Sequence, residues 1–164
     1  MKILNYFILF LHRIINVPML SNTSKYALRA VVYLAIHATP AAKIGIKKIS
    51  EELDIPSPFL GKILQTLARK KLLISTKGPN GGFALGKPAE EISLLYVVEL
   101  VDGLDVFHEC LIGLNICAGK EENHHKCPMH NLSDDLRKRL IDLFQNNSVA
   151  EIAIDIKKLE SLLK

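Results

Sequence analysis

A helical pattern followed directly by a glycine-rich hairpin pattern constrains this chain most strongly, and it lies between Ile55 and Phe83. Ser57 is a candidate N-cap, and Pro58 suits the first helical turn, where a missing N–H costs nothing. Residues 72–76 are apolar and partly β-branched, as in a strand, and residues 83–85 suit a returning strand. The turn 77–82 between them contains three glycines, so we expect positive φ at several positions. The helix would bury one apolar face, formed by Phe59, Leu60, Ile63, Leu64 and Leu67.

A helix followed by a β-hairpin with a basic tip predicts a winged helix, whose recognition helix enters the major groove while the wing lies beside it. Upstream, we expect one helix that is capped by Asn22 or Thr23 and ends at Thr39-Pro40, and a short helix over residues 48–53. The predicted fold class is therefore mainly α: a winged helix-turn-helix with a small β-hairpin wing, plus a long dimerisation helix.

Three amphipathic helices are predicted after the wing. The first spans residues 93–101 and stops at Asp102-Gly103. The second spans residues 132–144, with Ser133 as its cap, and the third follows Ser148. The last two could complete the core of one subunit, but the small size of the enclosed domain favours a dimer interface.

Charge divides the chain into segments. Residues 19–88 carry 11 Lys and Arg against 3 Asp and Glu, a net of +8, whereas residues 89–164 carry 8 against 14, a net of −6. A basic half favours a polyanion such as DNA as partner. We therefore assign residues 19–88 to a DNA-binding domain and residues 89–164 to a second region with a cysteine loop and dimerisation helices.

Residues 1–18 form an apolar extension that is interrupted by His12 and Arg13. It is short for a membrane-spanning helix, which needs about 20 apolar residues, and no small-residue cleavage site follows it. We expect translation of the native protein to begin at Met19; an amphipathic surface anchor is the alternative. The mass of the intact native protein tests this expectation.

Candidate DNA contacts lie on the recognition helix and the wing, because Lys side chains bind phosphates while amide side chains can read base edges. Phe59 also suits packing at the helix edge, and Ser57 also suits the cap. Gly61, inside the helix, would allow close approach of its backbone to DNA or to another helix. The candidates are Ser57, Phe59, Lys62, Gln65, Lys77 and Asn80.

The three cysteines lie in one stretch, with six residues between Cys110 and Cys117 and nine between Cys117 and Cys127. An odd number of cysteines without a secretory signal argues against a disulfide framework and predicts a cytoplasmic protein. Three thiolates leave a tetrahedral metal one ligand short, and His130 is the nearest candidate for the fourth. The residues alone leave three readings open: an iron–sulfur cluster, zinc, or a metal-free redox or structural role.

These segments, in this order, resemble the Rrf2 family of transcription regulators, with its IscR-like, NsrR-like and CymR-like members. The resemblance covers residues 19–143 and depends most on the wing GPNGGF and the terminal CPMH of the cysteine loop. It implies a homodimer with a winged helix-turn-helix in each subunit and a long helix that crosses to the partner. It also implies a [2Fe–2S] cluster, with [4Fe–4S] as the alternative, on Cys110, Cys117 and Cys127.

Within the resemblance, IscR-like members use a histidine in the CPxH position as fourth ligand, which corresponds to His130. NsrR-like members use an acidic residue near the start of the first helix, where this chain has Lys25. Three departures from the family pattern are the long gap before Cys127, Lys77 in place of an arginine, and Gly61 in place of an acidic residue.

The sequence thus predicts a dimeric DNA-binding regulator that senses cluster supply, redox state or nitric oxide, and it shows no constellation typical of an enzyme. A cluster-free or zinc-binding regulator of the same fold, controlled by thiol chemistry or by a protein partner, is the alternative. A carrier or electron-transfer protein would not need the wing and the basic half.

Overall fold

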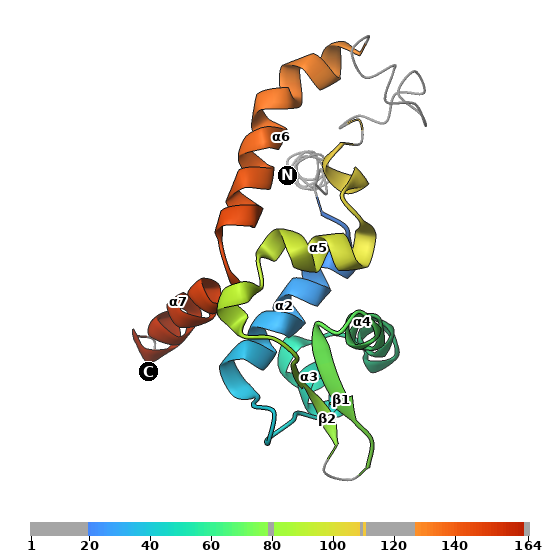
Figure 1. Ribbon diagram of the computed structural model, residues 1–164, viewed down its shortest axis with the longest axis vertical. Helices are drawn as coiled ribbons and strands as arrows, with labels where there is room; N and C mark the ends of the chain where they lie inside the picture. The colour runs from blue at the N-terminus through green and yellow to red at the C-terminus, as the bar shows by residue number, and fades with distance from the viewer. Residues whose placement is uncertain (1–19, 79–80, 109, 111–126, 163–164) are drawn as a thin grey trace, which may run out of the picture.

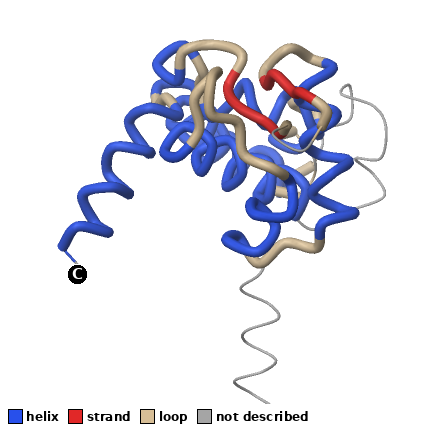
Figure 2. The backbone as a smooth tube through the Cα atoms, turned by 90° about the horizontal axis from the view of Figure 1, so that it is seen from below, coloured by secondary structure: helices blue, strands red, loops and turns tan. Residues whose placement is uncertain are grey.

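The computed structural model describes residues 20–78, 81–108, 110 and 127–162 (Figure 1). The winged helix comprises α2 (Asn22–His37), α3 (Ile46–Leu53), α4 (Ser57–Arg69), β1 (Leu73–Thr76) and β2 (Gly82–Leu85). After it come the 3-10 helix η1 (Ala89–Glu91), α5 (Leu94–Asp102), the 3-10 helix η2 (Asp105–Phe107), α6 (Pro128–Asn146) and α7 (Val149–Leu162). In the part of the chain that the structure describes, the two short strands form a single hairpin and the other regular elements are helices (Figure 2), which confirms the predicted fold class.

Helix α2 is the centre of the core, because it packs on α3, α4, α5, α7 and β2. Its small residues Ala27 and Ala30 are fully buried, as is Leu34, so neighbouring helices approach it closely. The cap of this helix is Ser21, whose hydroxyl accepts a hydrogen bond from the Ser24 N–H at 3.0 Å. The predicted caps Asn22 and Thr23 were therefore wrong by one or two positions, and both residues lie inside the helix.

The turn between α3 and α4 is made by Asp54, which adopts the left-handed conformation with φ 51°. Helix α4 then begins after Pro56, which makes no side-chain cap, so the prediction that Ser57 caps this helix was wrong. Pro56 has no side-chain group that could accept a hydrogen bond, but its carbonyl accepts from the N–H groups of Phe59 and Leu60, both at 3.0 Å. Proline supplies the entry geometry of this helix through its fixed φ.

Gly61 is buried on the side of α4 that faces α3. A Cβ at this position would lie 3.1 Å from the Ile46 Cδ1 atom, which is a tight contact. Of the two roles expected for Gly61, close approach of two helices is therefore the one that the structure supports.

The wing is the antiparallel pair of β1 and β2, with register from Leu73 opposite Leu85 to Thr76 opposite Gly82. Gly78 and Gly82 have φ of 110° and 154°, as expected for this turn. Two hydrogen bonds between the backbones of Ile44 and Phe83, at 3.0 and 2.8 Å, join the wing to the segment between α2 and α3. Strand β2 is therefore hydrogen-bonded along both edges, to β1 and to Ile44.

Helix α6 extends away from this body (Figure 1), and it begins at Pro128 rather than at the predicted residue 132. Ser133 lies inside the helix, where its hydroxyl donates to the Met129 carbonyl at 2.7 Å, so it is not the predicted cap. By contrast, Ser148 does cap α7, because its hydroxyl accepts from the Glu151 N–H at 3.2 Å while the Glu151 carboxylate accepts from the Ser148 N–H at 2.7 Å.

Candidate metal centre and nucleic-acid surface

The start of α6 carries two of the predicted metal ligands. Cys127 is the N-cap residue of this helix, and Pro128 follows it in the first turn. Since residues three apart share one face of a helix, His130 lies on the same side as Cys127. Both side chains are buried, with Cys127 0% and His130 7% exposed.

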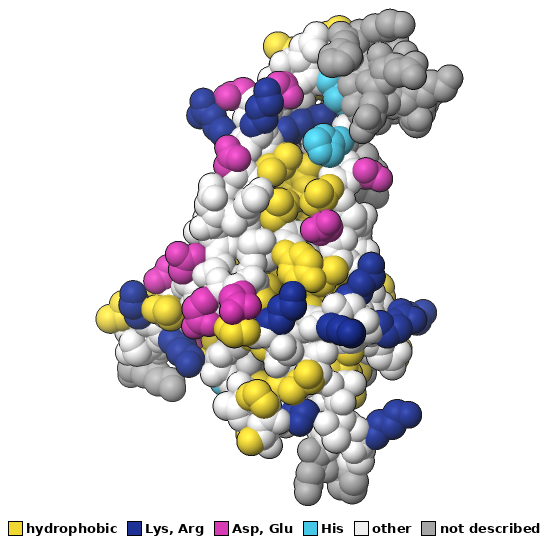
Figure 3. Space-filling model, viewed as in Figure 1, with side chains coloured by type: hydrophobic (Ala, Val, Ile, Leu, Met, Phe, Trp, Pro, Cys, Tyr) yellow, Lys and Arg dark blue, Asp and Glu magenta, His cyan; other side chains and the backbone are white. Residues whose placement is uncertain are grey.

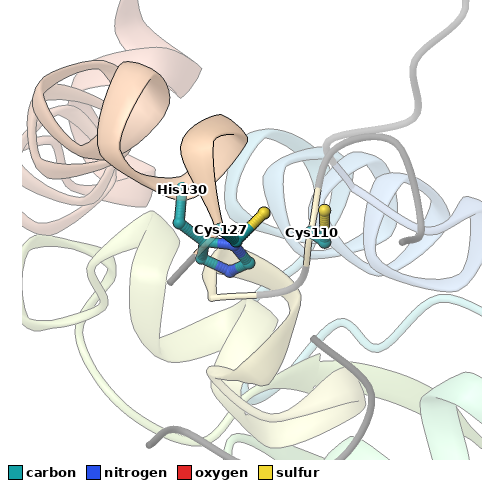
Figure 4. A group of neighbouring side chains, drawn as sticks. All are labelled: Cys110, Cys127 and His130. Carbon is teal, nitrogen blue, oxygen red and sulfur yellow. The ribbon is translucent and has the colours of Figure 1, made fainter. Parts of the chain in front are cut away.

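Cys110 reaches the same place from the segment after η2 (Figure 4). The ligand atoms of Cys110, Cys127 and His130 all lie within 4.8 Å of one another. The structure therefore brings together three of the four predicted ligands, which are separated by up to 20 positions in the sequence. The fourth, Cys117, lies outside the described residues.

The His130 ring is oriented by a backbone carbonyl. Its Nε2 atom lies 3.1 Å from the carbonyl oxygen of His108, and the buried Arg137 donates to the same oxygen from Nη1 at 3.2 Å. A neutral histidine that donates from Nε2 keeps the lone pair of Nδ1 for a metal. Such outer hydrogen bonds are typical of metal-binding histidines.

This set of donors fits a thiophilic metal. Two thiols and an imidazole suit zinc, iron or an iron–sulfur cluster, whereas calcium and magnesium prefer oxygen ligands. The position of Cys127 at a helix N-terminus also favours the negative charge of a bound thiolate centre. Sequence reasoning missed Arg137, because an arginine in an amphipathic helix ordinarily faces solvent, as its neighbours Lys138 and Arg139 do here.

The predicted DNA contacts lie on α4 and the wing. The side chains of Lys62, Gln65 and Lys77 are exposed, and Ser57 is partly buried at the start of α4. Phe59 is 40% exposed, but its ring packs edge-on against Tyr26 with centroids 5.7 Å apart, so part of it serves the fold. Asn80 lies outside the described residues. In Figure 3, Lys and Arg side chains gather around α4 and beside the wing.

Further cations lie where α4 ends. Arg69, Lys70 and Lys71 are all exposed there, and Lys71 adopts φ 61°.

Among the described residues, no helix is both long and apolar enough to cross a bilayer.

The fold and these two sets of residues define a class: winged helix-turn-helix proteins that carry a Cys/His group beside a long additional helix. Residues 20–155 match the family model Rrf2, described as an iron-dependent transcriptional regulator. The chain belongs to this family of DNA-binding transcriptional regulators, which are not enzymes, and the resemblance found in the sequence is confirmed.

Two groups of relatives illustrate the family. IscR of Serratia proteamaculans is 30% identical over 135 residues, which cover 81% of this chain and 77% of that protein. The crystal structure of Staphylococcus aureus CymR, 25% identical with a TM-score of 0.62, aligns over 81% of this chain and 96% of CymR. The structure of T. potens IscR, 17% identical with a TM-score of 0.65, aligns over 85% and 89% and shows the shared fold.

Proposed function

We propose that this regulator is a homodimer whose affinity for a two-fold DNA operator is set by an iron–sulfur cluster on Cys110, Cys117, Cys127 and His130. The observation that carries the proposal is the convergence of Cys110, Cys127 and His130 within 4.8 Å at the buried start of α6. A [2Fe–2S] cluster with one histidine ligand, as implied by the resemblance to IscR-like members, is the first candidate. When bound, a cluster would supply a change of charge or of occupancy in response to redox state, nitric oxide or cluster supply.

A chain of contacts between the proposed metal centre and the recognition helix α4 supports the proposal. The Asp102 carboxylate, at the end of α5, accepts hydrogen bonds from the hydroxyls of Ser21 and Ser24 at the start of α2. Only residues 103–109, which include η2, separate Asp102 from Cys110. Since α2 packs directly on α4, a displacement of the segment before Cys110 would shift the recognition helix.

The exposed face of α6 supports a dimer. Leu132, Leu136 and Leu143 are 80%, 53% and 55% exposed, while the buried residues of this helix are polar. A row of exposed leucines on a long helix is a surface that a second copy would cover. Two reading heads on one dimer would bind half-sites about one helical turn of DNA apart.

For DNA, we propose contacts from Lys62, Gln65 and Lys77, with Ser57, Phe59 and Asn80 at the edges of the surface. Replacing Lys77 by Ala should weaken binding to all sequences alike and lower the salt dependence by about one phosphate contact. The matched control is Lys157→Ala, because Lys157 is an exposed lysine on α7. Equal affinity of the two variants would remove Lys77 from the interface.

Zinc is the second candidate, because two thiols and an imidazole suit it equally well. It would leave a cluster-free regulator of the same fold, controlled by thiol chemistry or by a regulatory protein partner.

The deciding experiment is anaerobic purification, with assays of iron, acid-labile sulfide and zinc, followed by DNA binding in the loaded and metal-free states. Equal amounts of iron and sulfide, with a DNA affinity that differs between the two states, support the proposal. Zinc without sulfide would establish the second candidate. A DNA affinity that is the same in both states would refute control by the metal centre.

A further inference from the structure

Arg137 is a buried cation on a helix whose other cations are exposed. Arg137 is 7% exposed, whereas Lys138 and Arg139 lie on the solvent side of the helix. Lys138 pairs with Asp134 at 2.7 Å, and Arg139 pairs with Asp135 at 2.9 Å. Burying a guanidinium is costly unless it is hydrogen-bonded or compensated by negative charge. Arg137 therefore points toward the protein interior, unlike the two cations that follow it in the sequence.

The buried face of α6 gives the setting of this side chain. Among the described residues, the buried side chains of α6 are His130, Ser133 and Arg137, spaced so that they lie along one side of the helix. The Ser133 hydroxyl bonds to carbonyl oxygens of its own helix, those of Met129 and His130. Arg137 instead reaches across to the segment that leads to Cys110, where it donates to the His108 carbonyl at 3.2 Å.

The His108 carbonyl thus has two donors, Arg137 Nη1 and His130 Nε2. A carbonyl oxygen has two lone pairs, so both bonds can exist together. A carbonyl oxygen can only accept, so Nε2 is the donor in its bond, and the Arg137 guanidinium, which is always charged, holds that oxygen in place for it. His108 precedes Cys110 by two residues, so the same bond also holds the chain that carries that thiol.

We propose that Arg137 is a positioning residue of the metal centre: through the His108 carbonyl it fixes the ring of His130 and the approach of Cys110. Its positive charge also offsets the negative charge that the thiolates bring when they bind a metal. The inference rests on the proposed metal centre, but it applies to an iron–sulfur cluster and to zinc alike, because either would take thiolates and an imidazole from these residues.

The test uses cobalt(II) as the probe, because its visible bands report the ligand set whichever metal is native. The variants of the full chain are Arg137→Met, which keeps the length but removes the charge, and Arg137→Lys, which keeps the charge. Arg139→Met is the matched control on the exposed side, and His130→Ala gives the spectrum without the imidazole. Far-ultraviolet circular dichroism checks that each variant is folded.

We expect Arg137→Met to lower cobalt affinity about tenfold or more, as is usual when an outer hydrogen-bond partner is lost. Its ligand-field bands should move toward those of His130→Ala, and Arg137→Lys should recover part of the affinity and of the spectrum. Arg139→Met should match the wild type in both. An Arg137→Met protein with wild-type affinity and bands would overturn the proposal, and so would a lysine variant as impaired as the methionine variant.

The outcomes also separate this inference from the proposed function. A wild type that binds cobalt through thiolates but takes up no iron and sulfide would reject the iron–sulfur proposal and leave the role of Arg137 to be decided by its variants. A wild type that takes up a cluster, with Arg137→Met unchanged in every readout, would reject the positioning role alone. A wild type that binds neither would reject both.

Discussion

Gly82 holds the wing against the body of the protein, and replacing it by alanine should destabilise the fold. Its φ of 154° lies where side chains are rarely accommodated, which costs about 1–3 kcal/mol. An added Cβ would lie 2.4 Å from both the carbonyl carbon and the oxygen of Ile44, and these backbone atoms cannot move away as a side chain would. The two hydrogen bonds between Ile44 and Phe83 would have to lengthen or break, each worth about 0.5–1.5 kcal/mol.

We therefore expect Gly82→Ala to lower the free energy of unfolding by about 2–4 kcal/mol in urea denaturation. Because the wing is a proposed DNA contact, the variant should also bind DNA more weakly. Gly61→Ala is the matched control. Alanine gains about 1 kcal/mol over glycine inside a helix, and the neighbour it meets at 3.1 Å is only the terminal methyl group of Ile46. A Gly82→Ala protein as stable as Gly61→Ala would refute the reasoning that backbone contact at Ile44 anchors the wing.

Three further predictions concern the helical region. Leu136→Lys should give monomers instead of the proposed dimer, as measured by light scattering, because it places a charge in the row of exposed leucines on α6. A variant that remains dimeric would show that this face is not the dimer interface. The N–H and hydroxyl of Ser148 lower the pKa of Glu151 below its usual 4.5, so the carboxylate adds stability that is full above that pH and is lost as the pH falls through the lowered value. Glu151→Gln should flatten this acid limb in urea titrations, and an unchanged limb would contradict the assignment. Asp102→Ala should cost about 1–3 kcal/mol, because the buried Ser24 hydroxyl loses its acceptor; unaltered denaturation would show that this bond adds nothing.

The sequence was sufficient to predict the winged helix, because periodic apolar residues and glycines act locally. The apolar residues predicted to face the core from α4 are mostly buried, and glycines predicted in the turn of the wing have positive φ. The ends of helices were less predictable. Ser57 and Ser133 both resemble caps, but Pro56 sets the start of one helix and Pro128 begins the other before the serine is reached.

The sequence predicted which residues come together in the candidate site, but not the groups that support them. Cysteine and histidine reveal their chemistry by type and spacing, so Cys110, Cys127 and His130 could be named in advance. The His108 carbonyl carries no signal in the sequence, since every residue has one. Arg137 could not be distinguished from Arg139 without knowing which side of α6 faces the segment before Cys110.

The separation of α6 from the core has a consequence for reversibility. Among the described residues, the main hydrophobic cluster draws on α2 to α5, the wing and α7, and includes no side chain of α6. We therefore expect the region around Cys110, Cys127 and His130 to open locally while the winged helix remains folded. If the proposed centre holds a metal, metal-free chains should remain folded and able to bind metal again, unlike small zinc domains, which unfold when their metal is removed.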